Sequence, residues 1–98
     1  MAIIVSFDFP DAGQELYDAV IERVTGGQGF TQFADLPNPG LISHAAGPVD
    51  GGGFRVTEVW DSAEALETHA KTFGPILADL GFADVQPVII PAYNVVVR

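Results

Sequence analysis

The chain has 98 residues, enough for one domain spanning 1–98 and too few for a second hydrophobic core. Its formal net charge is −9, and only four residues are lysine or arginine, which argues against binding to nucleic acid or to anionic membrane surfaces. The lack of cysteine excludes disulfides, thiolate metal sites and cysteine nucleophiles, and it is typical of a cytoplasmic protein.

Residues 2–9 alternate as a β-strand does, with large apolar side chains at the odd positions. The even positions are mixed and include Ser6 and Asp8. We expect the odd positions to face the core, and Ser6 and Asp8 to face a cavity or a partner. This segment lacks the basic start of a signal peptide, and no other segment is long enough to span a bilayer.

A helix is expected to follow the first strand. Asp11 followed by Gln14 resembles a capping box, so the helix should begin there. Apolar residues then recur at helical spacing as far as Val24. The glycine pair at 26–27 predicts the end of this helix.

Residues 26–40 form a long connection with no helical or strand period of its own. Loops of this length are often functional lids. Phe30 and Phe33 within it can either fold over a pocket or pack against the core.

Two strands, 41–49 and 54–60, should form a hairpin, because the segment DGGG at 50–53 between them is a strong turn signal. The register of this hairpin decides the neighbours of His44. If paired residue numbers sum to an even value, His44 shares a face with Glu58 and Trp60; if the sum is odd, it shares a face with Thr57 and Val59. The even register would make a His–Glu pair that can act as an acid/base unit, or a cross-strand surface pair.

A second helix is expected after the hairpin. Asp61 should cap it, with Glu64 at the matching capping-box position. An apolar stripe runs along it, Gly74–Pro75 should kink or restart it, and Gly81 should end it. His69 is on the apolar stripe, where a histidine is either a core residue or a group that accepts a proton from, or donates a hydrogen bond to, a bound phenol.

The last strand is predicted over residues 85–97. Pro87 and Pro91 confine it to an edge of the sheet or to a bulge. Tyr93 and Asn94 interrupt its apolar sequence, so we expect them to meet a ligand or a partner subunit.

The order of strand, helix, strand, strand, helix, strand predicts an α+β fold of ferredoxin-like βαββαβ topology. In this fold a four-stranded antiparallel sheet carries both helices on one face. The other face is bare, and a second copy of the chain is its expected cover.

The segment VWDSAEALETH at 59–69 resembles the signature of the antibiotic-biosynthesis-monooxygenase branch of the dimeric α/β-barrel superfamily. A tryptophan ends the third strand, an acidic residue and a serine follow, and a histidine comes nine residues after the tryptophan. The resemblance implies a homodimer that packs its sheets face to face and keeps a pocket between sheet and helices in each subunit. Members of the superfamily include cofactor-free oxygenases of polyketide anthrones, haem-degrading enzymes, cyclases and isomerases, and proteins without a known activity.

The resemblance also implies site residues. Trp60 and His69 occupy the aromatic and histidine positions of the motif, which places Trp60 at the pocket wall, with core packing as its alternative. The haem-degrading members carry an axial histidine further along the second helix, where Asp79 stands here, so haem is not expected.

The function predicted from the sequence is that of an enzyme for a hydrophobic aromatic or polyketide-like molecule, without metal, flavin or other cofactor. It would remove a proton from an activated phenol or anthrone, and the carbanion would then react with oxygen. The alternatives are a cyclase or isomerase of the same fold, and a ligand-binding or structural dimer. The predicted catalytic residues are His69, His44 and Glu58, and the predicted substrate contacts are Trp60, Tyr93, Asn94, Ser6 and Asp8.

Overall fold

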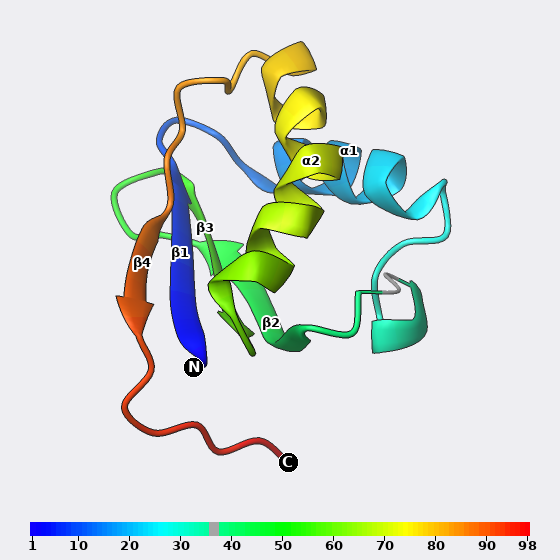
Figure 1. Ribbon diagram of the computed structural model, residues 1–98. Coiled ribbons are helices and arrows are strands. Elements are labelled where there is room, and N and C mark those ends of the chain that lie inside the picture. Colours follow the sequence, from blue (N-terminus) through cyan, green and yellow to red (C-terminus); the bar gives the residue numbers. More distant parts are fainter. Residues whose placement is uncertain (36–37) are drawn as a thin grey trace.

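A computed structural model describes residues 1–35 and 38–98 of the chain. Its elements are β1 (Ile3–Phe9), α1 (Gln14–Thr25), the short 3-10 turn η1 (Phe33–Asp35), β2 (Leu41–Pro48), β3 (Phe54–Trp60), α2 (Ala63–Asp79) and β4 (Val88–Pro91). The strands form one antiparallel sheet in the order β2-β3-β1-β4, and both helices lie on the same face of it (Figure 1). The predicted ferredoxin-like arrangement is confirmed.

The core lies between the sheet and the two helices. All four odd positions of β1 are buried, as the alternation predicts, and they meet Leu66 and Leu77 of α2 in one apolar cluster. Trp60 at the end of β3 belongs to the same cluster and is completely buried. The even positions of β1 lie on the opposite, uncovered face of the sheet.

Both helix starts differ from the sequence prediction. Asp11 adopts a left-handed conformation with φ 60° in the turn after β1, so α1 begins only at Gln14, after Gly13, and has no side-chain cap. The cap of α2 is Ser62 rather than Asp61: its side chain accepts a hydrogen bond from the Ala65 amide at 3.1 Å. The amide of Asp61 instead donates to the Gly40 carbonyl at 2.8 Å, which ties Asp61 to the start of β2.

Two further expectations concern Pro75 and the last strand. Pro75 lies inside α2, which continues from Ala63 to Asp79, so the predicted restart does not occur and the alternative, a kink, stays a prediction. The last strand spans only Val88–Pro91, because β1 begins at Ile3 opposite Pro91 and leaves the following residues no strand to pair with. The last ladder contact is the bond from the Ala92 amide to the Ala2 carbonyl at 2.9 Å.

Residues 26–40 make the long connection that the sequence predicts, interrupted only by η1, and residues 36–37 of it lie outside the described part of the chain. Phe33 is exposed, whereas Phe30 turns inward against β2. Among the described residues, neither helix has the length and apolar character needed to cross a membrane.

Candidate functional site

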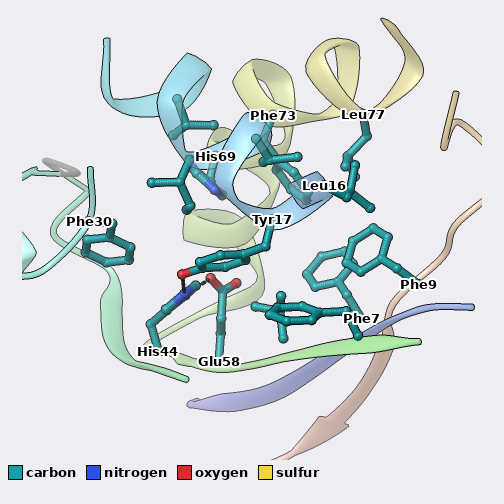
Figure 2. A pocket seen from close by; sticks show the side chains of 15 residues that line it. Phe7, Phe9, Leu16, Tyr17, Phe30, His44, Glu58, His69, Phe73 and Leu77 are labelled. Atoms are coloured by element: carbon teal, nitrogen blue, oxygen red, sulfur yellow. Dashed lines mark hydrogen bonds and ion pairs between the residues drawn. The ribbon is translucent and has the colours of Figure 1, made fainter. Parts of the chain in front are cut away.

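A cavity of about 60 Å³ lies between the sheet and the helices, closed above by α1 and α2 (Figure 2). Its walls are mainly apolar, and only Tyr17, His44, Glu58 and His69 contribute polar groups. The first three of these meet at one end, so the cavity has an apolar body and a polar end, which is the usual design of a small-molecule site.

The polar end is a chain of hydrogen bonds that starts at α1 and ends in the core. The Tyr17 hydroxyl lies 2.7 Å from His44 Nε2, and His44 Nδ1 lies 2.8 Å from Glu58 Oε2 (Figure 2). The other oxygen of Glu58 accepts a bond of 3.0 Å from the Trp60 indole N–H. A carboxylate can only accept, so Nδ1 of His44 donates its proton to Glu58, and when the ring is neutral Nε2 accepts from Tyr17.

The register of the hairpin creates the His–Glu pair. His44 is directly opposite Glu58, which is the even register, and both side chains face the helices. A bulge between Leu41 and Ser43 inserts one residue into β2. Because the bulge changes the alternation, Leu41 and His44 both point inward, although one has an odd number and the other an even number.

Glu58 is the one buried charged or polar residue of the described chain, with 5% of its surface exposed. Its side chain is 7% exposed and that of His44 is 13% exposed. A buried carboxylate must be hydrogen-bonded to be tolerated, and here each oxygen has its own donor. The geometry therefore fixes the tautomer and the orientation of the His44 ring.

Two pKa shifts describe the electrostatics of the site. Burial raises the pKa of Tyr17, and the carboxylates of Glu58 and Asp18 raise it further. Burial lowers the pKa of His69, partly opposed by Glu58 and reinforced by His44. At neutral pH Tyr17 is therefore a phenol and His69 a neutral imidazole.

His69 lies on the opposite wall of the cavity, on α2. Its ring stacks on Phe73, with centroids 4.9 Å apart, and lies 5.2 Å from the Trp60 ring. Its nitrogens make no hydrogen bond to a side chain of residues 1–35 or 38–98. It can therefore offer a donor or an acceptor to a bound molecule.

The other predicted contacts do not meet at this cavity. Trp60 lies beneath the polar chain, and its N–H is already bonded to Glu58. Ser6 and Asp8 lie on the uncovered face, because strand alternation turns them away from the helices, and Asp8 pairs with Arg55 at 2.6 Å. These positions can contact a partner but not the cavity.

Tyr93 and Asn94 also lie outside the cavity. They follow the end of β4 and are exposed, Tyr93 completely so. They do not line this cavity in the single chain, and their contact with a ligand or a partner stays a prediction.

The sequence analysis missed Tyr17, which it treated as part of the apolar stripe of the first helix. A buried tyrosine usually has a hydrogen-bond partner for its hydroxyl, so a tyrosine on a core-facing stripe predicts a polar contact in the core. Phe30 was recognised as able to cover a pocket, and its ring is 4.8 Å from that of His44 at the cavity wall.

No protein-family model matches the chain, and no curated protein sequence is significantly similar to it. Solved structures do match its fold, among them those of a cofactor-independent oxygenase, a candidate antibiotic biosynthesis monooxygenase and a further monooxygenase. The resemblance noted in the sequence is thereby confirmed for the fold.

Three of these structures illustrate the similarity. The cofactor-independent oxygenase SnoaB of Streptomyces nogalater, as its N63A mutant, has 15% identity and a TM-score of 0.62, over 96% of this chain and 95% of its own. A candidate antibiotic biosynthesis monooxygenase of Deinococcus radiodurans has 16% identity and a TM-score of 0.62, over 100% and 98%. The ActVA-Orf6 monooxygenase of Streptomyces coelicolor, in complex with nanaomycin D, has 18% identity and a TM-score of 0.60, over 99% and 92%.

Proposed function

We propose that this protein is an enzyme that removes a proton from a hydrophobic phenolic or anthrone-like substrate, which then reacts with oxygen without a bound cofactor. The observation that carries the proposal is the His44–Glu58 pair, 2.8 Å apart at the polar end of an otherwise apolar cavity. The fold it shares with a cofactor-independent oxygenase and with a monooxygenase in complex with the ligand nanaomycin D supports the same kind of chemistry.

The proposed reaction needs two things from the protein. The first is a proton acceptor, and an imidazole backed by a carboxylate is well suited to this because the carboxylate stabilises the imidazolium that forms. The second is a donor to the enolate oxygen, and the neutral His69 on the opposite wall can supply an N–H. The substrate carbanion then passes electrons to oxygen and a C–O bond forms; the resulting peroxide takes back the proton held on His44, and loss of water from the hydroperoxide leaves the quinone.

Substrate entry requires the cavity to enlarge. Its volume of about 60 Å³ is well below the roughly 300–1,000 Å³ of typical ligand pockets. Phe30 covers His44 from the connection after α1, so its displacement would open the polar end. Enclosure after entry would keep water from the carbanion.

Oxygen consumption with 1,8-dihydroxyanthrone, in the presence of a chelator, tests the proposal. The wild-type protein should consume oxygen faster than the spontaneous reaction, and His44→Ala should lose this excess while it stays folded. An anthrone that binds, as judged by Trp60 emission, without any oxygen uptake would contradict the oxygenase assignment and leave cyclisation or isomerisation. Absence of saturable binding would contradict the enzyme proposal itself.

We also propose that a second copy covers the open face of the sheet. Ile4 of β1 lies between Val59 of β3 and Ile90 of β4, so a row of β-branched apolar side chains crosses this face. Ile90 is 49% exposed in the single chain. Light scattering should give the mass of a dimer for the wild type and of a monomer for Ile90→Lys; a monomeric wild type would refute this proposal.

A further inference from the structure

Tyr17, His44 and Glu58 all line the cavity, but Tyr17 rather than His44 has a free acceptor. Both ring nitrogens of His44 are occupied, Nδ1 by Glu58 and Nε2 by the Tyr17 hydroxyl. A substrate could bond to Nε2 of His44 only by displacing Tyr17 from a contact of 2.7 Å. The Tyr17 oxygen, after donating to His44, still has a lone pair that can accept.

We propose that Tyr17 is the catalytic residue that takes the substrate's proton while it passes its own hydroxyl proton to His44. This inference rests on the proposed proton-abstraction function. It assigns to that function a residue on α1 that belongs to none of the sequence patterns used to predict the site.

Two protons move in the proposed step, one from the substrate to Tyr17 and one from Tyr17 to His44. The O–H or acidic C–H bond of the substrate breaks and its electron pair stays on the substrate as an enolate or carbanion. The proton bonds to the Tyr17 oxygen, the Tyr17 O–H bond breaks, and that proton bonds to His44 Nε2. Tyr17 is a neutral phenol before and after the step, and the new imidazolium lies against the Glu58 carboxylate. The order of donor, imidazole and carboxylate is that of a serine–histidine–aspartate triad, with a phenol in place of the serine.

The surroundings of Tyr17 favour transfer over retention of a negative charge. Glu58 from β3 and Asp18 on its own helix face it, and with burial they raise its pKa, so a lasting tyrosinate is disfavoured. His44 from β2 receives the proton, while His69 on α2 is a neutral imidazole. Tyr17 is held in this position by Phe54, whose ring centroid is 5.4 Å away, and by the hydrogen bond to His44.

Tyr17→Phe tests the inference, because it removes only the hydroxyl from the stacked ring. With 1,8-dihydroxyanthrone, kcat for oxygen uptake should fall by about 100-fold or more, the range of general acid–base catalysis, with a much smaller change in KM. Thr68→Val is the matched control: it removes a hydroxyl from an exposed position of α2 that does not line the cavity, and it should keep wild-type kinetics. Circular dichroism would verify that both variants are folded.

A second measurement needs no turnover. 4-Nitrophenol absorbs visible light only when ionised, so its colour reports whether the bound phenol has given up its proton. The wild type and Thr68→Val should ionise the bound probe at a pH where the free probe is mostly neutral, and Tyr17→Phe should bind it without ionising it.

The outcomes separate the two proposals. If Tyr17→Phe keeps wild-type kcat and ionises the probe while His69→Asn does neither, His69 is the acceptor and the inference is overturned, but the proposed function stands. If the wild type neither oxidises the anthrone nor ionises the nitrophenol, the proposed function fails and the inference fails with it.

Discussion

Replacing Glu58 by alanine should lower the free energy of unfolding by about 3 kcal/mol, because it leaves two donors without an acceptor. The Trp60 N–H lies in a ring that is 0% exposed, so water cannot replace the lost oxygen there. The His44 side chain is 13% exposed rather than completely buried, so its unpaired donor should cost less than that of Trp60. Each orphaned buried donor costs about 1–3 kcal/mol, and the volume of the missing side chain adds a cavity term.

Glu58→Gln removes the negative charge of the side chain but keeps its size and shape, so it separates the effect of the charge from that of the lost volume. The amide can still accept from Trp60 through its oxygen, but its NH₂ then faces His44 and forces the proton of that ring from Nδ1 to Nε2. His44 would donate to the Tyr17 oxygen, and the proton path from Tyr17 to His44 would be blocked. We expect a loss of only about 1–2 kcal/mol in stability, together with a loss of turnover as large as that of Tyr17→Phe.

Urea unfolding followed by Trp60 emission and by circular dichroism measures these differences. Glu67→Ala is the matched control: it removes an exposed carboxylate from α2 and should change stability by no more than about 0.5 kcal/mol. For a domain of this size, about 1 kcal/mol corresponds to 4–8 °C in Tm, so Glu58→Ala should be clearly separated from the control. A Glu58→Ala variant as stable as Glu67→Ala would refute the buried hydrogen-bond chain.

Three further changes test other contacts. Burial lowers the pKa of His69 from its ordinary value of 6.5. As the pH falls through 6.5, the unfolded chain therefore binds a proton more readily than the folded chain does, and the free energy of unfolding decreases. His69→Phe should remove this part of the acid sensitivity, as measured by urea titrations at neutral and mildly acidic pH. Gly40→Ala would place a methyl group against the Ala65 side chain and should cost about 1–3 kcal/mol in thermal unfolding, whereas an unchanged Tm would contradict the close approach. Ser62→Ala should lower the free energy of unfolding by about 1 kcal/mol, because it removes the side-chain cap of α2. Asp61→Ala is the comparison, and an equal loss of stability in that variant would indicate that Asp61 is the cap instead.

The alternation of residues was sufficient to predict the sheet and its buried face, but not the ends of its strands. The buried odd positions of β1 follow from period-2 hydrophobicity alone. The last strand was predicted to run over residues 85–97, a mainly apolar segment, yet pairing stops where β1 starts. Strand length depends on the partner as well as on local sequence, and that information lies elsewhere in the chain.

The candidate site could be predicted only in part for the same reason. His44 and Glu58 were recognisable as a possible pair, but a glycine-rich turn permits two registers, and only the observed hairpin with its bulge selects one. Tyr17 could not be linked to them from spacing, because the contact joins α1 to β2 across 27 residues of sequence. Long-range contacts of this kind depend on how the helix packs on the sheet.

The contact between Phe30 and His44 affects both the entry of a substrate and the exclusion of water from the hydrogen-bonded side chains at the polar end of the cavity. The chain of Tyr17, His44 and Glu58 can hold a defined tautomer only while water is kept from the His44 ring, and the Phe30 ring 4.8 Å away is one of the groups that exclude it. A substrate larger than about 60 Å³ must move groups of this wall to enter, and it then has to replace Phe30 as the cover of His44. A flat aromatic ring can do both, because it excludes water as the phenylalanine does and presents its own hydroxyl to Tyr17. For the proposed enzyme, we therefore expect planar aromatic substrates to be preferred over flexible aliphatic ones.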